Sequence, residues 1–185
     1  MKIRKITLAL ILCLASLEMA YSQNWEVLEE SAEAGDIEAQ MTLGFAYLEG
    51  EGVEQDDIEA SYWFLLAAEE DHPDAQYILG AMIQLGRGFT QDLEKAARYY
   101  AYAANQGHAY AQYELANAYL NGRGRPMDPG LAYMWYAIAY DTASALDDSD
   151  LMKRANAGRE LAALELSSTE IIDLKLKAMN FSPSR

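Results

Sequence analysis

The chain has 185 residues, of which 51% are hydrophobic, and this is enough for one domain with its own core. Its formal net charge is −15, because 29 acidic side chains outnumber 14 lysines and arginines. Such a surface repels phosphate backbones and anionic lipid headgroups, so neither nucleic acids nor membrane surfaces are expected partners.

The first 22 residues have the features of a secretory signal peptide. Basic residues at 2, 4 and 5 precede an apolar run over 6–17, which is shorter than a membrane span, and small residues stand at 20 and 22. We therefore expect cleavage after Ser22 and a periplasmic or secreted mature protein without membrane insertion. The chain's one cysteine, Cys13, lies in the apolar run, so the mature chain is expected to have no thiol. An uncleaved membrane anchor or a core helix is the alternative interpretation of this segment.

A repeat of 36 residues organises the chain that follows. It relates Gln40, Gln76 and Gln112 to one another without gaps. The same step relates the residues at 39, 43, 50, 52, 56, 60, 63 and 67 to identical or similar residues in the next two copies. Periods of this length are typical of stacked helical repeats.

Each copy is predicted to form a helix, a glycine turn and a second helix. A stripe at 39, 43 and 47 predicts the first helix, and glycines at 50 and 52 end it. Asp56 is placed to cap the second helix, whose stripe lies at 60, 63 and 67. Gly35 and Gly107 are expected to end second helices, and Asp71 stands at the equivalent place.

Helix pairs of this kind bury their apolar stripes only by stacking on neighbours, so the repeats need capping helices at both ends. A helix over about 149–164 and another that begins at Ser167, with Glu170 at the spacing of a capping box, are expected to close the far end. Residues 181–185 are expected to fray. We predict a signal peptide at 1–22, an N-terminal capping helix at 23–36, repeats at 37–72, 73–108 and 109–144, and C-terminal capping helices and a tail at 145–185.

Three segments carry a resemblance to a known family. They read AQMTLGFAYLEGEGVEQD at 39–56, AQYILGAMIQLGRGFTQD at 75–92 and AQYELANAYLNGRGRPMD at 111–128. This pattern resembles the Sel-1-like repeat family, a relative of the tetratricopeptide repeats. Asp71 and Ala116 depart from it where glycine is usual, and Ile83 where tyrosine is usual.

The resemblance implies an all-α, right-handed α/α superhelix, or solenoid, that serves as an adaptor or scaffold in protein complexes. Bacterial members are often exported and act in the cell envelope. Some exported, cysteine-rich members have been linked to β-lactam binding, but this chain lacks their cysteines. The resemblance therefore predicts an envelope adaptor that binds a protein or peptide. A cell-wall-active protein that binds β-lactams or peptidoglycan, or hydrolyses them weakly, is the alternative.

A second set of side chains lies opposite the core stripe of the first helices when each residue turns the helix by about 100°. In tetratricopeptide relatives, this side of the first helix lines a concave groove. Aromatic and methionine side chains edged by carboxylates suit a surface that anchors a partner, although packing between stacked helices is an equal alternative. The predicted partner-binding residues are Glu38, Met41, Phe45, Leu48, Asp74, Tyr77, Gln84, Tyr110, Tyr113 and Asn117.

The sequence contains no catalytic constellation, so we expect no enzyme and no cofactor. Ser149 and Lys153 are one residue too far apart for a Ser-x-x-Lys motif, and no nucleophile elbow or phosphate-binding loop occurs. His72 and His108 stand one repeat apart, too far to share a metal ion, and are expected at helix starts. The acidic run at 147–150 lacks the spacing of an EF-hand loop, so a capping role is expected there.

Overall fold

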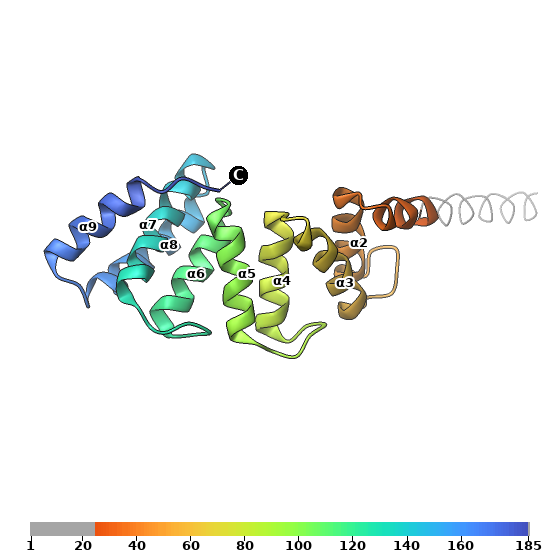
Figure 1. The fold of residues 1–185 in the computed structure, drawn as a ribbon, viewed down its shortest axis with the longest axis horizontal. Coiled ribbons are helices and arrows are strands. Elements are labelled where there is room, and N and C mark those ends of the chain that lie inside the picture. The colour runs from red at the N-terminus through yellow and green to blue at the C-terminus, as the bar shows by residue number, and fades with distance from the viewer. Residues whose placement is uncertain (1–24, 185) are drawn as a thin grey trace, which may run out of the picture.

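The computed structural model describes residues 25–184, which contain helices and turns and no strand (Figure 1). The predicted signal peptide and its cleavage site lie outside the described residues. The predicted all-α class is confirmed. A helical segment over residues 25–33 is followed by α2 (Ile37–Glu49), α3 (Asp57–Glu69), α4 (Pro73–Leu85), α5 (Leu93–Asn105), α6 (Ala109–Asn121), α7 (Pro129–Ala145), α8 (Ser149–Ala163) and α9 (Ser168–Met179).

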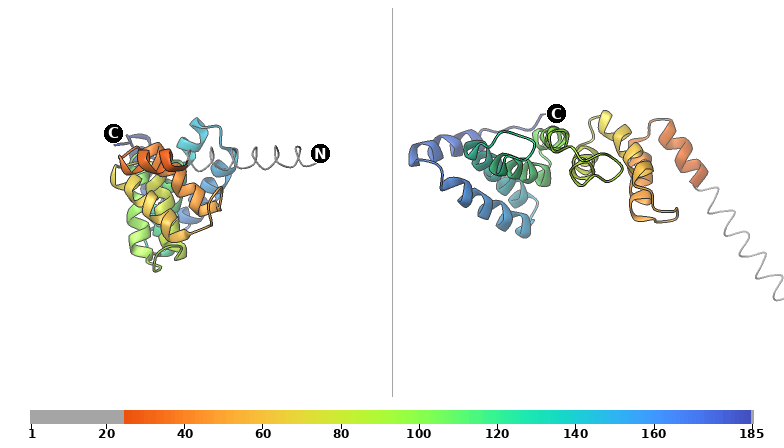
Figure 2. Two further views of the ribbon diagram at one scale, coloured as in Figure 1. Left: turned by 90° about the vertical axis from the view of Figure 1, so that its right-hand side faces the viewer. Right: turned by 90° about the horizontal axis from the view of Figure 1, so that it is seen from below.

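The helices stack in chain order along the long axis, with the helical segment at 25–33 and α9 at opposite ends, and the C-terminal residues turn back towards α5 in the middle (Figures 1 and 2). Each helix from α2 to α7 packs against the next one in the sequence, and in addition α6 contacts α8 and α7 contacts α9. This is the all-α repeat superhelix that the repeat predicts. Within the described part of the chain, every helix is too short or too polar to cross a membrane.

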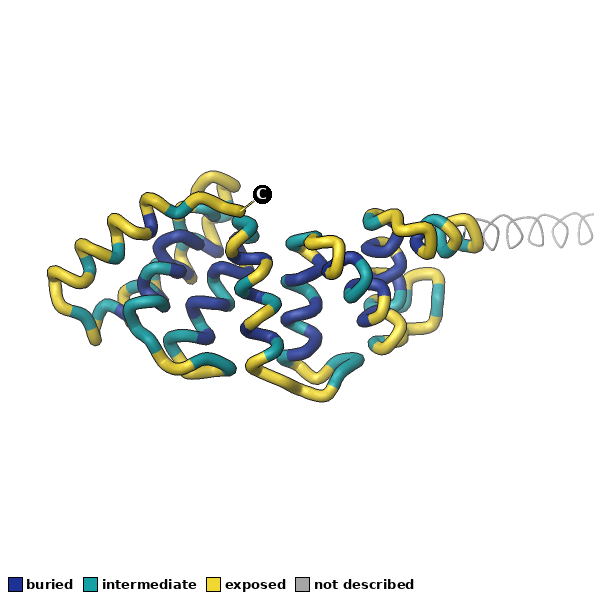
Figure 3. The backbone as a smooth tube through the Cα atoms, viewed as in Figure 1, coloured by how far each residue is buried: buried dark blue, intermediate teal, exposed yellow. Residues whose placement is uncertain are grey.

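Buried positions recur along α2 to α8, in one large cluster and a smaller one towards each end of the stack, whereas α9 is mostly exposed (Figure 3). Leu43, Leu79 and Leu115 occupy the same position in successive repeats, and each is at most 1% exposed. Removing side chains of this size from water contributes roughly 1.5–3 kcal/mol each, which is the main favourable term in stacking. Equivalent residues of the repeat thus occupy equivalent places in the core.

Small residues on the first helices let the aromatic rings of the second helices approach closely. A Cβ atom added to Gly44 would lie 2.7 Å from the Phe64 ring, and one added to Gly80 would lie 2.9 Å from the Tyr100 ring. In the third repeat Ala116 replaces this glycine. There the corresponding ring, Tyr136, packs closely against Gly158 of α8, so a glycine is supplied from the capping helix.

The repeated glutamines join each first helix to the helix before it. Gln40, Gln76 and Gln112 are buried, and the Nε2 atom of each donates to the backbone carbonyl eight residues earlier, at 3.0, 3.4 and 3.3 Å respectively. A buried amide is costly unless it is hydrogen-bonded, so this position tolerates few other side chains.

Side chains cap the N-terminal ends of the helices as the sequence predicts. The carboxylates of Asp56, Asp92 and Asp128 accept backbone N–H bonds at the starts of α3, α5 and α7. His72 and His108 begin α4 and α6, where their Nδ1 atoms accept from backbone N–H groups three residues on, at 3.3 and 3.0 Å. The expected helix-start roles of both histidines are confirmed.

Asp71 ends α3 in a left-handed conformation although it is not glycine. Its φ is 60°, and Gln76 Nε2 donates to its carboxylate at 3.1 Å. Aspartate tolerates this conformation better than most residues because its short side chain bonds locally. This contact explains how the repeat accepts a departure from glycine at this position.

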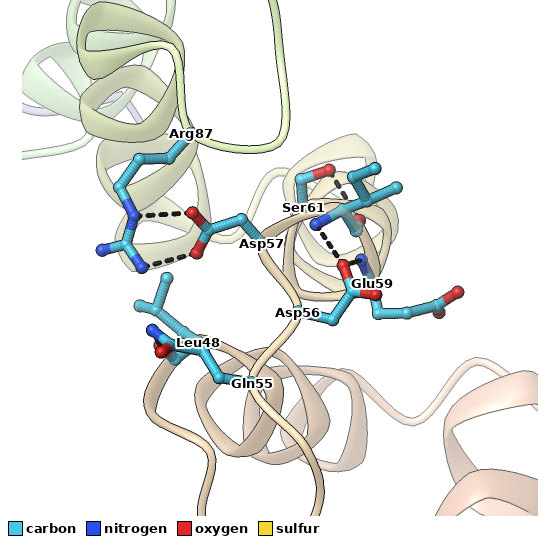
Figure 4. Close-up of polar contacts among 8 residues, drawn as sticks. Leu48, Gln55, Asp56, Asp57, Glu59, Ser61 and Arg87 are labelled. Atoms are coloured by element: carbon cyan, nitrogen blue, oxygen red, sulfur yellow. Dashed lines mark hydrogen bonds and ion pairs between the residues drawn. The ribbon is translucent and has the colours of Figure 1, made fainter.

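In the second and third repeats, the second glycine of the Gly-x-Gly turn touches the preceding repeat. A Cβ atom on Gly88 would overlap the carbonyl oxygen of Asp57, at the start of α3. Beside it, Arg87 donates to the Asp57 carboxylate through two nitrogens, Nε to Oδ2 at 3.0 Å and Nη2 to Oδ1 (Figure 4). The Arg87 guanidinium holds the pKa of Asp57 below its ordinary value. The turn therefore ends a helix and also fixes the spacing between repeats.

The C-terminal residues pack back on the stack, so the expectation of a frayed tail is wrong for residues 181–184. The Phe181 ring lies edge-on against Trp135 of α7, with centroids 5.4 Å apart. Ser184 then donates its backbone N–H to the carbonyl of Asn105 at 2.8 Å. The two capping helices begin as predicted, α8 at the Asp148 cap and α9 at the Ser167–Glu170 capping box.

Candidate binding groove

Aromatic side chains from adjacent repeats meet on the first-helix face between α4 and α6. The Tyr77 ring stacks on the imidazole of His108, with centroids 4.6 Å apart and an interplanar angle of 25°. It also lies 5.9 Å from the Tyr100 ring and 6.2 Å from the Tyr110 ring. Two predicted groove residues, Tyr77 and Tyr110, thus come together although they belong to different repeats.

The aromatic face continues from α6 onto the capping helix α8. The Arg154 guanidinium lies 4.6 Å from the centroid of the Tyr113 ring, a cation–π distance. The Tyr110 hydroxyl donates to the Asp148 carboxylate at 2.6 Å. Sequence reasoning missed Arg154 and Asp148 as groove residues, because α8 lies outside the 36-residue repeat that supplied the angular pattern.

In the third repeat, the Tyr113 ring packs against a second tyrosine, which is buried in the core. Tyr113 lies 5.7 Å from Tyr136, measured between ring centroids, and the Tyr136 hydroxyl donates to Asn117 Oδ1 at 2.6 Å. Burial raises the pKa of Tyr136 well above its ordinary value, so its hydroxyl stays protonated and remains a donor. We call Tyr77, Tyr100, Tyr110, Tyr113 and Tyr136 the tyrosine cluster.

A polar pocket of about 210 Å³ is lined by residues of α4, α5 and α6 and of the turn after α6. Two predicted groove residues, Gln84 and Asn117, line it. The pocket also contains a carboxylate, Glu114, and a guanidinium, Arg123. We call it the Glu114 pocket, and its full lining is Gln84, Leu93, Ala97, Tyr100, Glu114, Asn117, Ala118, Asn121 and Arg123.

Glu114 is a half-buried carboxylate among tyrosines. Asn117 Nδ2 donates to its Oε2 at 3.2 Å. Burial raises the pKa of Tyr77 and of Tyr100, and the nearby Glu114 charge raises both further. Sequence reasoning missed Glu114. The available signal was its contrast with Ile78 and Thr42, which hold the same position in the two preceding repeats.

His108 is held as a neutral imidazole in this face. Burial lowers its pKa, and the Asp74 carboxylate, 3.3 Å from Nε2, opposes that effect. A neutral ring leaves Nδ1 free to accept the Ala111 N–H bond at the start of α6 and keeps its face against Tyr77. The imidazole therefore serves as a cap and as part of the aromatic face.

The structure separates the predicted groove residues into three groups. Phe45 and Tyr110 are 42% and 40% exposed, and Glu38 and Asp74 are also exposed. A second group is half-buried: Leu48, Tyr77, Gln84, Tyr113 and Asn117. Whether these two groups bind a partner stays a prediction.

Met41 does not line the groove. It is 7% exposed and packs in the core with Phe64 and Met82, so its assignment to a binding surface is wrong. The flank of α2 at this position is covered by the helices that follow it in the stack. Phe45, one turn further on, packs edge-on against Phe64 at 5.2 Å yet keeps part of its ring exposed.

Comparisons with known proteins bear on the architecture. A model of the Sel1 repeat matches residues 37–72, 73–108 and 109–141, which is more than half of the chain. The crystal structure of a Sel1 repeat protein from Oxalobacter formigenes is similar, with 37% sequence identity and a TM-score of 0.62, over 73% of this chain and 98% of that one. The comparison with curated proteins gives no match.

A second solved structure shares the fold. It is a protective antigen present in uropathogenic Escherichia coli strains that displays an SLR fold, with 23% identity and a TM-score of 0.60. The alignment covers 85% of this chain and 41% of the antigen. With three repeats matched and these structural neighbours, the chain belongs to the Sel1 repeat family.

Proposed function

We propose that this protein is an exported adaptor that captures a segment of a partner protein on its first-helix face, in a bacterial cell envelope. Sel1 repeats generally mediate protein–protein interactions, which supports a binding rather than a catalytic role. The features at residues 1–22 support export to the periplasm or the exterior.

The observation that carries the proposal is the tyrosine cluster. Large aromatic side chains with polar ends are enriched at the centres of protein interfaces, because they bury much area at a low cost in side-chain entropy. Here the tyrosines come from two repeats and lie beside a pocket that contains a carboxylate, Glu114, and a guanidinium, Arg123. Tyr77, Tyr110 and Tyr113 keep part of their rings accessible on this face, whereas Tyr100 and Tyr136 are buried and support them from the core.

Site-specific photo-crosslinking in the native host tests the proposal. Benzoylphenylalanine replaces Phe45 or Tyr110 on the first helices in one pair of variants. In a control pair it replaces Tyr62 or Tyr102, which are 50% and 55% exposed and lie on second helices. All four positions are exposed aromatic residues, so folding and labelling efficiency are matched.

We expect the same envelope protein to be crosslinked from positions 45 and 110 and not from 62 or 102. Adducts from the control positions with none from the groove positions would place the interface on the second helices and contradict the proposal. The mature N-terminus, read from the same purified protein by mass spectrometry, tests export separately. An intact residue 1 would contradict it.

A further inference from the structure

We propose that the Glu114 pocket receives a lysine or arginine side chain of the partner segment, with the Glu114 carboxylate as its counter-ion and the Tyr100 ring as one wall. This inference rests on the proposed function and specifies the chemistry of the partner. It makes Glu114 a specificity-determining residue of the adaptor.

The size of the pocket favours a single side chain. Sites that enclose a whole small molecule have volumes of about 300–1,000 Å³. The Glu114 pocket has about 210 Å³, and its wall residue Tyr100 packs against the half-buried ring of Tyr77. A long, unbranched side chain can enter such a pocket while the rest of the partner segment stays outside, on the accessible rings of Tyr77, Tyr110 and Tyr113.

The charge of the pocket favours a cation. Glu114 is half-buried, and the described residues place no cationic group within 4 Å of its carboxylate. Arg123, which lines the same pocket, is exposed, and so is Arg154 over Tyr113. Exposed charges are screened by water and salt much more than buried ones, so the carboxylate dominates the field inside the pocket.

The repeat itself does not require a carboxylate at the position of Glu114. The same position holds Thr42 in the first repeat and Ile78 in the second, so the helix pair folds there without a carboxylate. Taking a carboxylate partly out of water is unfavourable unless a charged or hydrogen-bonding partner compensates. One amide bond from Asn117 supplies part of this compensation, and an ammonium or guanidinium group of the partner would add a stronger, charge-assisted bond.

The competing occupant is an acidic side chain bound by Arg123. The equivalent arginine of the preceding repeat, Arg87, bonds Asp57, but Leu93 occupies the place of that aspartate beside Arg123. The described residues contain no ion pair of Arg123 within 4 Å. The net charge of −15 repels an acidic segment and attracts a basic one. A basic side chain is therefore favoured over an acidic one as the occupant of the pocket.

Selection from a random library of 12-residue displayed peptides tests the inference on the mature chain. Peptides selected on the wild-type protein are synthesised in three forms, with the basic residue kept, replaced by norleucine or replaced by glutamate. Their dissociation constants are measured for the wild type, Glu114→Gln and Glu51→Gln. Glu51 is exposed in the first glycine turn, so its substitution removes the same charge away from the pocket.

We expect the selected peptides to share a lysine or arginine at one position. Glu114→Gln should weaken the basic peptide by about tenfold or more, as for a lost charge-assisted bond, and leave the norleucine form within about twofold. Glu51→Gln should change neither. Arg123→Gln, which removes the cation that lines the same pocket, should strengthen binding of the basic peptide, and this readout does not depend on how Glu114→Gln folds.

The outcomes separate the inference from the proposed function. Peptides that bind without a basic residue, or equally to Glu114→Gln, overturn the inference and leave the adaptor function in place. Preference for the glutamate form, lost in Arg123→Gln, assigns the pocket to an anion and also overturns it. A library that yields no binder contradicts the adaptor function together with the inference.

Discussion

Replacing Gly88 with alanine should destabilise the protein much more than replacing Gly86, two residues earlier in the same turn. The backbone is left-handed at both positions, with φ of 69° and 71°, so the conformational strain of a Cβ atom is nearly equal. The surroundings differ. At Gly86 the nearest atom to a new Cβ would be 3.6 Å away, which is an ordinary contact, whereas at Gly88 it would overlap the Asp57 carbonyl oxygen and lie 2.9 Å from Ser61 Cβ.

The magnitudes follow from these two terms. Left-handed backbone costs an L-residue about 1–2 kcal/mol, and this applies to both variants. Forcing an extra carbon into a packed contact costs about 1–3 kcal/mol more, because the first repeat must move away from the second. That movement also stretches the Arg87–Asp57 ion pair, whose side chains are 38% and 33% exposed and which contributes at most about 1 kcal/mol. We expect Gly88→Ala to cost about 2–3 kcal/mol more than Gly86→Ala.

Urea unfolding of the mature chain, followed by circular dichroism at 222 nm, measures the difference. The free energy of unfolding comes from linear extrapolation, and a smaller slope in Gly88→Ala would show that the first repeat unfolds separately. Gly124 and Gly122 form a second matched pair, with φ of 72° and 64°, and only a Cβ on Gly124 would overlap the preceding repeat, at Leu93 O. Equal losses within each pair would refute the assignment of the second glycine to inter-repeat contact.

Two further predictions concern the tail and the buried imidazole. Ending the chain after Asn180 removes the ring that covers Trp135, so the melting temperature should fall by about 2–4 °C for each kcal/mol of lost packing, and an unchanged melting curve would show that the tail does not contribute. His108→Asn keeps a capping side chain and removes the titrating group. Because burial lowers the pKa of His108 below its unfolded value near 6.5, its contribution is complete above that pH and is lost as the pH falls towards the folded pKa. The wild type should therefore lose more stability than His108→Asn between pH 7 and pH 5 in urea titrations, and parallel losses would contradict a buried neutral imidazole.

The fold could be predicted from the sequence because one period carries several independent constraints at once. Gln40 and its equivalents must reach a carbonyl of the preceding helix, and Leu43 and its equivalents must be buried, so both recur at the same step. Glycines and aspartates mark the same helix ends in every copy. When propensity, pattern and capping agree in this way, the sequence specifies one arrangement.

The candidate groove could be predicted only in part, because a helical period gives a direction around one helix and nothing about its neighbours. Met41 and Phe45 point to the same predicted side, yet the following helices cover the first and leave the second 42% exposed. Arg154 reaches the groove from α8, which lies outside the repeat, so no spacing in the sequence relates it to Tyr113. Residues 181–184 pack on α5 and α7 through contacts that are distant in sequence.

Departures from the repeat are more informative about binding than its matches. The matched positions are those that every helix pair needs, so they report on stacking alone. Two departures with charge consequences, Glu114 in place of Ile78 and Leu93 in place of Asp57, meet at the same pocket although they belong to different helices. One introduces a carboxylate, and the other removes the partner of an arginine. The preceding interface is closed by Arg87 and Asp57 and shows that the repeat stacks without either change, and the proposed recognition of a charged group at this interface would account for both.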